Sequence, residues 1–267
     1  MVRAEAKSRR VEDYQEIRLT NPVRLGEVNK EGADHSMTNE EVSSNYFIPQ
    51  LTFIRFLAVL WIVMFHYARN SFPFSANVFL QNLILHDYLA VTFLFVLSGF
   101  TLAVRYFGRQ IDPKSFMLAR FARIYPLYAL GLLFVVVIDA FSGTLHNKAM
   151  AIVLNVMVVQ AWVPPFALSL NFPGWFLSAL FPFYLVFALF VDRFRRLPPM
   201  KIVLSLTLIW LGSFAILILI KKTIDTEQFL ARDLFIFYNP LMHLNSFLIG
   251  VGGGIIFRAK ELHRHDF

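Results

Sequence analysis

The sequence contains no cysteine and few charged residues, and both shortages narrow what the protein can be. Without cysteine there can be no disulfide, no thiolate nucleophile and no cysteine-ligated metal. Only 16% of the 267 residues are charged and 57% are hydrophobic, whereas a soluble domain averages about 25% charged residues. The apolar residues gather in long runs, so we expect an all-α, polytopic transmembrane helical bundle and not a soluble domain.

Acidic residues are also fewer than basic ones, which gives a formal net charge of +7 and a pI of about 9.7. In a soluble protein this excess would raise the prospect of nucleic-acid binding. In a membrane protein it is typical of lysine and arginine on cytoplasmic loops. We therefore expect the lipid bilayer as a partner, and no nucleic acid.

The N-terminal region, residues 1–49, has no apolar segment of the kind found in a cleaved signal peptide. It is polar and of mixed charge, which predicts a disordered tail. Residues 50–258 form the predicted transmembrane domain, and residues 259–267 a basic C-terminal tail.

Seven apolar runs fall within the transmembrane domain. They cover residues 51–68, 88–106, 124–140, 149–163, 174–191, 202–220 and 234–257. The loop 105–123 carries five lysines and arginines, whereas the loop 69–87 carries only Arg69. By the positive-inside rule the first loop is cytoplasmic, and so is the N-terminus of this multi-pass protein.

The run at 149–163 decides between six and seven spans. The basic segment DRFRRLPPMK, residues 192–201, should also be cytoplasmic, and it would face the other side if 149–163 crossed the membrane. This run is short and closes on Trp162, Pro164 and Pro165. Short apolar runs are more often interfacial or re-entrant. We favour six spans with one re-entrant or surface helix, and seven is the alternative.

Arg55 and His66 are two costly residues within the first apolar run. Eleven helical positions bring them within about 20° of one face and separate them by roughly 16 Å along the axis. An imidazole can take a proton from a hydroxyl, and a guanidinium can bind phosphate through two parallel hydrogen bonds. The alternatives are snorkelling to opposite interfaces, or a histidine that only bonds a neighbouring helix.

Four other segments carry candidate residues. Arg120 and Arg123 share a face at the start of the third span, where they suit either a polyanion or lipid head groups. Ser98 and Gly99, like the Gly252–Gly254 stretch, fit close helix packing. Trp175 and Tyr184 suit an aromatic belt or a substrate platform. His243 could line the same cavity as His66, or be a hydrogen-bonded core residue. No metal-binding motif is present.

In this order, these segments resemble the acyltransferase 3 family of membrane O-acyltransferases. The similar parts are IRFLAVLWIVMFHY with its Arg-x10-His spacing, DYLAVTFLFVLSGF, ARFARIYPLY, PGWFLSALFPFYL and LMHLNSFLIG. The resemblance implies transfer of an acyl group, often acetyl from acetyl-CoA, to a hydroxyl of a carbohydrate, lipid or small molecule. It implies that His66 is catalytic with Arg55 as its motif partner, and that Arg120 and Arg123 bind acyl-CoA. Ser98, Gly99 and Phe100 match the family's Ser-Gly-Phe.

Two departures from the family pattern bear on activity. Leu180 and Phe181 stand where many members carry an acidic pair, and the chain has fewer spans than is usual. We therefore expect a C-terminally truncated member. The alternative function is an inactive relative that acts as a membrane carrier, regulator or binding subunit. A proton-coupled transporter built on His66 is a third interpretation, although the paired intramembrane acids common in transporters are missing.

Overall fold

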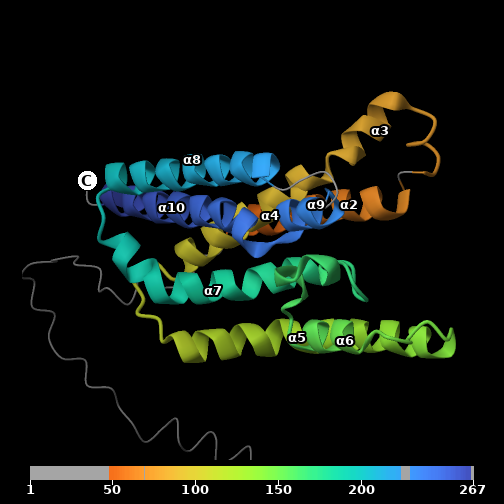
Figure 1. Cartoon of the computed structure of the whole chain (residues 1–267). Helices are drawn as coiled ribbons and strands as arrows, with labels where there is room; N and C mark the ends of the chain where they lie inside the picture. The colour runs from red at the N-terminus through yellow and green to blue at the C-terminus, as the bar shows by residue number, and fades with distance from the viewer. Residues whose placement is uncertain (1–47, 69, 224–228, 266–267) are drawn as a thin grey trace, which may run out of the picture. The chain divides into compact units, whose positions relative to one another are not determined.

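The structure is a computed structural model that describes residues 48–68, 70–223 and 229–265 (Figure 1). The tail predicted for residues 1–49 falls almost wholly outside these ranges. Within them every regular element is a helix. The elements are α2 (Pro49–Ala68), α3 (Val78–Leu85), α4 (Asp87–Arg105), α5 (Pro113–Phe141), α6 (Ala149–Val156), the short turns η1 (Gln160–Trp162) and η2 (Pro164–Phe166), α7 (Gly174–Arg195), α8 (Pro199–Thr223), α9 (Phe229–Tyr238) and α10 (Pro240–His265).

Six helical segments among the described residues are long and apolar enough to cross a membrane. They are Pro49–Ala68, Val78–Arg105, Pro113–Phe141, Gly174–Arg195, Pro199–Thr223 and Arg232–Glu261. Within the run 149–163, only the 8 residues of α6 form an α-helix, about 12 Å of helix against a hydrocarbon core of about 30 Å. The predicted all-α polytopic bundle is confirmed, and the six candidate spans agree with the favoured count, since α6 is too short to cross as a helix.

Local sequence signals explain where several helices begin. Asp112 caps α5 by accepting a hydrogen bond from the backbone N–H of Ser115 at 2.9 Å, and Pro113 occupies the first helical position. Pro240 separates α9 from α10, and the Asn239 side chain accepts from the Leu241 N–H at 3.1 Å. At its other end α10 continues to His265, through residues predicted as a basic tail.

The crossing of α4 and α10 forms the centre of the bundle, with glycines on both helices. A Cβ atom on Gly99 would collide with the carbonyl oxygen of Phe247, and one on Gly250 with that of Val96. A Cβ on Gly254 would lie 2.7 Å from the Phe100 carbonyl oxygen. The close packing predicted for the glycine segments is therefore present, and it brings the two backbones into contact.

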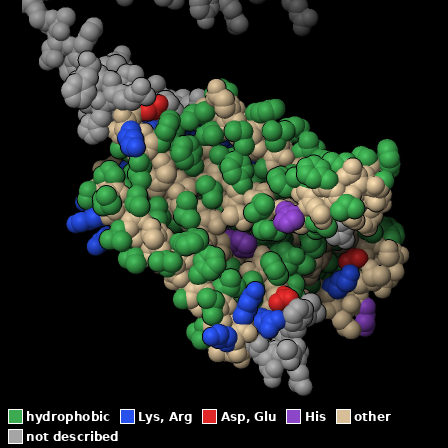
Figure 2. Space-filling model, turned by 90° about the horizontal axis from the view of Figure 1, so that it is seen from above, with side chains coloured by type: hydrophobic (Ala, Val, Ile, Leu, Met, Phe, Trp, Pro, Cys, Tyr) green, Lys and Arg blue, Asp and Glu red, His purple; other side chains and the backbone are tan. Residues whose placement is uncertain are grey.

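One end of the bundle collects most of the basic residues, and we call it the basic end. Arg195 fastens the end of α7 to the α4–α5 loop by donating to the Tyr106 and Arg109 carbonyls, each at 3.0 Å. The guanidinium of Arg258, late in α10, lies 5.9 Å from the ring centroid of Phe107 in the same loop. Hydrophobic side chains spread across the face seen in Figure 2, with lysine and arginine gathered toward its margins.

Candidate active site

A cavity of about 880 Å³ lies in the half of the bundle away from the basic end. Both His66 and His243 line it, as do residues from six helices and the segment before α7. The lining residues are Val59, Ile62, Phe65, His66, Asp87, Tyr88, Val91, Thr92, Leu94, Phe172, Pro173, Trp175, Phe176, Ser213, Phe214, Leu217, Ile236, Phe237, Tyr238, Met242, His243, Asn245 and Ser246. The wall is mainly apolar and aromatic, with a few polar groups set into it.

His66 stands in the last turn of α2, with its side chain largely exposed at the edge of the cavity. Its ring meets those of Phe65 and Phe172 edge to face, each with a centroid distance of 5.0 Å. Phe172 comes just before the Pro173-Gly174 break that starts α7. No ring nitrogen of His66 has a hydrogen-bond partner among the described residues. The imidazole is therefore accessible to a molecule in the cavity.

Arg55 lies on the same side of α2 but does not line the cavity. Its Nη2 donates to the Thr101 hydroxyl on α4 at 3.2 Å. Between Arg55 and His66, Ala58 and Ile62 pack α2 against α4. The shared face predicted from the spacing is therefore present, with the arginine near the basic end and the histidine at the cavity.

Arg120 is held among aromatic rings at the basic end. Its Nη2 donates to the Tyr106 hydroxyl at 3.2 Å. Its guanidinium carbon lies 5.0 Å from the centroid of the Phe116 ring and 5.8 Å from that of Tyr184. Stacking of this kind favours arginine over lysine. The structure thus fixes the guanidinium by one hydrogen bond and its ring contacts.

Arg120 and Arg123 lie three positions apart on α5, and Arg55 donates to Thr101 in the half of α4 that leads to the basic end. We call these three arginines the arginine cluster. Arg123 is exposed, so its guanidinium is open to an incoming group. Its members are the residues that the sequence proposed for phosphate binding.

Trp175 and Tyr184 are both buried, at 7% and 8% exposure. A belt position at the lipid interface is therefore excluded for them. Trp175 lines the cavity, where its ring lies 5.3 Å from His243 and 5.1 Å from Tyr238. Tyr184 lies nine residues further along α7, about 14 Å along the axis. The two residues therefore mark the cavity and the arginine cluster at separate depths of the bundle.

His243 lines the cavity and is also hydrogen-bonded. Cavity lining and hydrogen bonding, offered by the sequence as alternatives, therefore both hold for this residue. Its Nε2 lies 2.8 Å from the Phe237 carbonyl oxygen. Its ring stacks on that of Phe95 at 5.0 Å, with an interplanar angle of 27°. The structure therefore brings His66 and His243, which are far apart in sequence, to one cavity.

Ser98 and Gly99 have packing roles and do not line the cavity. The Ser98 hydroxyl donates to the Leu94 carbonyl of its own helix at 2.7 Å. At the positions of the family's acidic pair, Leu180 is buried, and Phe181 packs against the rings of Phe121 and Tyr184. Apolar packing thus replaces the carboxylates there.

Sequence reasoning missed several polar residues that line the cavity. Asp87 is the first residue of α4, where a carboxylate suits the positive end of the helix dipole. Thr92, Ser213, Asn245 and Ser246 add hydroxyl and amide groups. Asp87 and Asn245 lie inside motifs already singled out, but their orientation toward the cavity had no signal in the sequence. Among the described residues, no group of three or more histidine, aspartate or glutamate side chains is arranged so that it could hold a metal ion.

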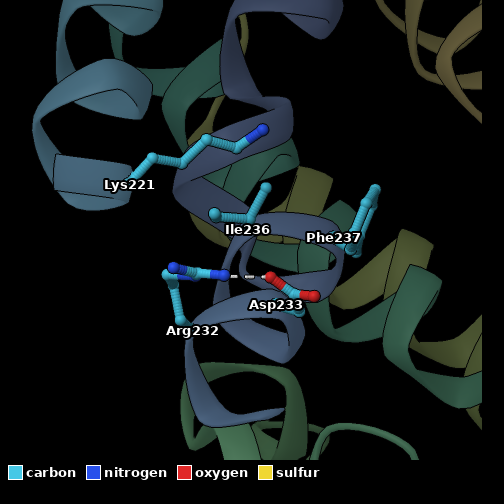
Figure 3. A pocket seen from close by; sticks show the side chains of 5 residues that line it. All are labelled: Lys221, Arg232, Asp233, Ile236 and Phe237. Carbon is cyan, nitrogen blue, oxygen red and sulfur yellow. Dashed lines mark ion pairs between the residues drawn. The ribbon is translucent and has the colours of Figure 1, made fainter. Parts of the chain in front are cut away.

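A second, smaller hollow of about 400 Å³ lies beside the cavity (Figure 3). Lys221, Arg232 and Asp233 line it together with Ile236 and Phe237, and these last two residues also line the cavity. Arg232 and Asp233 form an ion pair of 3.5 Å between Nε and Oδ1, drawn as the dashed line in Figure 3.

Comparison with known proteins agrees with the motif order. The family model of acyltransferase 3, described as an acyltransferase domain, matches residues 48–265. The acyltransferase MdmB of Streptomyces mycarofaciens is 33% identical over 162 residues, which cover 57% of this chain and 41% of that protein. Protein 2 in the picA locus of Rhizobium radiobacter is 38% identical over 104 residues, which cover 32% of this chain and 53% of that protein.

The matches span about half the length of these curated relatives or less. No solved structure matches the chain. The family match covers most of the sequence and all five of the motif segments, which confirms the resemblance. The chain therefore belongs to the acyltransferase 3 family.

Proposed function

We propose that this chain acts in a membrane-bound O-acyltransferase that moves an acyl group, acetyl in the first instance, from acyl-CoA to a hydroxyl. One observation carries the proposal: the accessible imidazole of His66 lines the cavity on the helix whose other half carries Arg55, toward the basic end that also holds Arg120 and Arg123. A proton-accepting group and a phosphate-binding group are the two things that such a reaction requires.

The arginine cluster is the proposed site for the CoA phosphates. Guanidinium groups bind phosphate through paired, charge-assisted hydrogen bonds, and three of them match a multiply charged ligand. The thioester would then extend along the bundle toward the cavity. The positive-inside rule supports a cytoplasmic position for the basic end, where acyl-CoA is available.

His66 is the proposed general base. Its imidazole takes the proton of the acceptor hydroxyl, and the hydroxyl oxygen attacks the thioester carbonyl carbon. The carbon–sulfur bond then breaks, the CoA sulfur leaves with the bonding electron pair, and the imidazolium returns the proton to it. An ester and free CoA result. A variant of this route has the imidazole carry the acyl group briefly before the hydroxyl accepts it.

The acceptor is proposed to enter the cavity from the end opposite the arginines. His66 lies in the last turn of α2 and Asp87 starts α4, so the cavity lies toward that end. The proposed acceptors are hydroxyl-bearing carbohydrates, lipids or small molecules, and the apolar wall favours one with an apolar body.

The test is His66→Ala in membranes supplied with radiolabelled acetyl-CoA and n-octyl β-D-glucoside. General-base catalysis contributes about 10²–10⁴-fold, so transfer should fall at least 100-fold at equal expression. Tyr67→Ala is the matched control, because Tyr67 is the next residue, is 82% exposed and does not line the cavity. Unchanged transfer in the His66 variant would refute the assignment. A wild-type chain without transfer at equal expression would favour the inactive relative.

A further inference from the structure

We infer that His243 is a second acceptor-binding residue, whose Nδ1 accepts a hydrogen bond from a hydroxyl other than the one acylated at His66. The inference deepens the proposed function and rests on it. It names a substrate class: an amphiphile that carries a sugar or another cyclic polyol on an apolar body.

The hydrogen bond to Phe237 fixes the tautomer of His243. A carbonyl oxygen can only accept, so the Nε2 that lies 2.8 Å from the Phe237 oxygen carries the proton. In the neutral ring the lone pair then sits on Nδ1. The ring cannot rotate freely, because it stacks on the fully buried Phe95 and contacts Trp175. Nδ1 is therefore an acceptor held in a fixed position.

This nitrogen has no hydrogen-bond partner among the described residues. In the described part of the bundle, it is not one of the fully buried polar atoms that lack a hydrogen-bond partner. It is therefore not sealed off from a ligand. An acceptor left without a donor in an apolar wall costs free energy, unless a ligand or water supplies one. A histidine with a purely structural role would need only the Phe237 bond.

The two histidines approach the cavity from different helices, His66 from α2 and His243 from α10. A simple alcohol can satisfy one of them, whereas a polyol can satisfy both. The Trp175 ring beside His243 lines the cavity with only 7% of its surface exposed, so it adds a small apolar contact for the C–H groups of a sugar ring. The surrounding apolar wall suits a hydrophobic body attached to that sugar.

The experiment measures binding of radiolabelled n-octyl β-D-glucoside and n-octanol to the full chain in phosphatidylcholine nanodiscs, with empty nanodiscs subtracted. Octanol has the same tail but a single hydroxyl. In His243→Gln, the side-chain amide reaches the position of Nε2 and keeps a donor for Phe237, but the Nδ1 acceptor is lost. In His243→Asn, the amide oxygen reaches the position of Nδ1.

His243→Gln should weaken octyl glucoside binding about three- to tenfold, as expected for one neutral hydrogen bond, and leave octanol binding unchanged. His243→Asn should restore part of the loss. His86→Gln is the matched control, since His86 Nδ1 also bonds a backbone carbonyl, that of Asn82, but does not line the cavity.

Several results would overturn the inference. They are an equal loss for both ligands, no loss for either, no binding of octyl glucoside by the wild-type chain, or a wild-type chain that does not prefer octyl glucoside to octanol. Failure of the proposed function looks different: the binding pattern persists, but no label passes from acetyl-CoA to octyl glucoside. Transfer without any effect of His243→Gln would refute only the inference.

Discussion

Polar side chains in this bundle divide into those that fasten helices and those that are available to a ligand. The Ser98 hydroxyl and the Arg195 guanidinium donate hydrogen bonds to backbone carbonyls. His66 and the Nδ1 of His243 have no such partner among the described residues. Since unpaired polar groups in an apolar environment are costly, the second group contains the residues proposed to meet substrates.

Arg120 offers a residue-scale test of the arginine cluster. Arg120→Gln should weaken binding of radiolabelled acetyl-CoA at least tenfold, because a hydrogen bond to a charged group contributes about 1.5–3 kcal/mol. Arg120→Lys should recover little, since the forked contact and the stacking on Phe116 are lost.

Arg193→Gln is the control for that experiment, because Arg193 is an exposed arginine of the same basic end. Arg193→Gln should change acetyl-CoA binding by no more than about twofold, because a distant exposed charge is largely screened by salt. Arg123→Gln removes an exposed member of the cluster without disturbing ring packing. Equal losses in the Arg193 and cluster variants would show that only overall charge matters.

Among the elements, the crossing of α4 and α10 positions residues that line the cavity, whereas α6 contributes none. The crossing sets Phe95 against His243, and it depends on glycine at the contact. The α6 segment is held by buried polar groups: Tyr128 donates to the Asn155 carbonyl at 2.8 Å, and Asn155 Nδ2 donates to Ser169 at 2.9 Å. These hydrogen bonds anchor α6, a helix too short to span, to α5 and to the segment that leads to Phe172.

Glycine substitutions test the crossing. Gly99→Ala and Gly250→Ala each place a methyl group against the backbone of the partner helix, so both should lower the thermal unfolding midpoint and the yield of folded protein. Gly212→Ala on α8 is the control, because a Cβ added there would meet no atom of the described residues within 4 Å. It should be neutral or slightly stabilising, given alanine's better helix propensity. A Gly99 variant as stable as the Gly212 variant would contradict this packing.

At the scale of the whole molecule, six spans place the basic segments 105–123 and 192–201 at one end, together with Arg258 and Lys260. Lys221, Lys222 and Arg232 flank a loop at the other end. The same count puts residues 114 and 196 on one side of the membrane, whereas a seventh span at 149–163 would put them on opposite sides. The placement of α6 as a non-spanning helix thus decides the topology of everything that follows it.

The natural absence of cysteine makes this topology easy to test. Single cysteines at Lys114 and Arg196 should react with a membrane-impermeant maleimide only after the membrane is opened, if the basic end is cytoplasmic. A cysteine at Thr144, in the turn after α5, should react in intact cells. Labelling of positions 114 and 196 from opposite sides would contradict six spans, and labelling of both from outside would reverse the proposed orientation.

Sequence by itself determined the apolar runs, the basic end and the residues that carry the family motifs, and it favoured six spans over seven. These are local properties, because hydrophobicity is compared with a fixed bilayer thickness and loop charge is read segment by segment. It also placed Arg55 and His66 on one helical face, since helix geometry fixes that relation.

Only the tertiary structure decided which of these residues meet. Trp175, a candidate for an aromatic belt, lies in the cavity wall. The Ser98 hydroxyl bonds its own helix, and Asp87 lines the cavity although no sequence signal pointed to it. The tautomer of His243 depends on a carbonyl six residues away across the Pro240 break. The cavity itself depends on contacts between helices distant in sequence, such as the close packing at Gly99 and Gly250, which no local pattern sets.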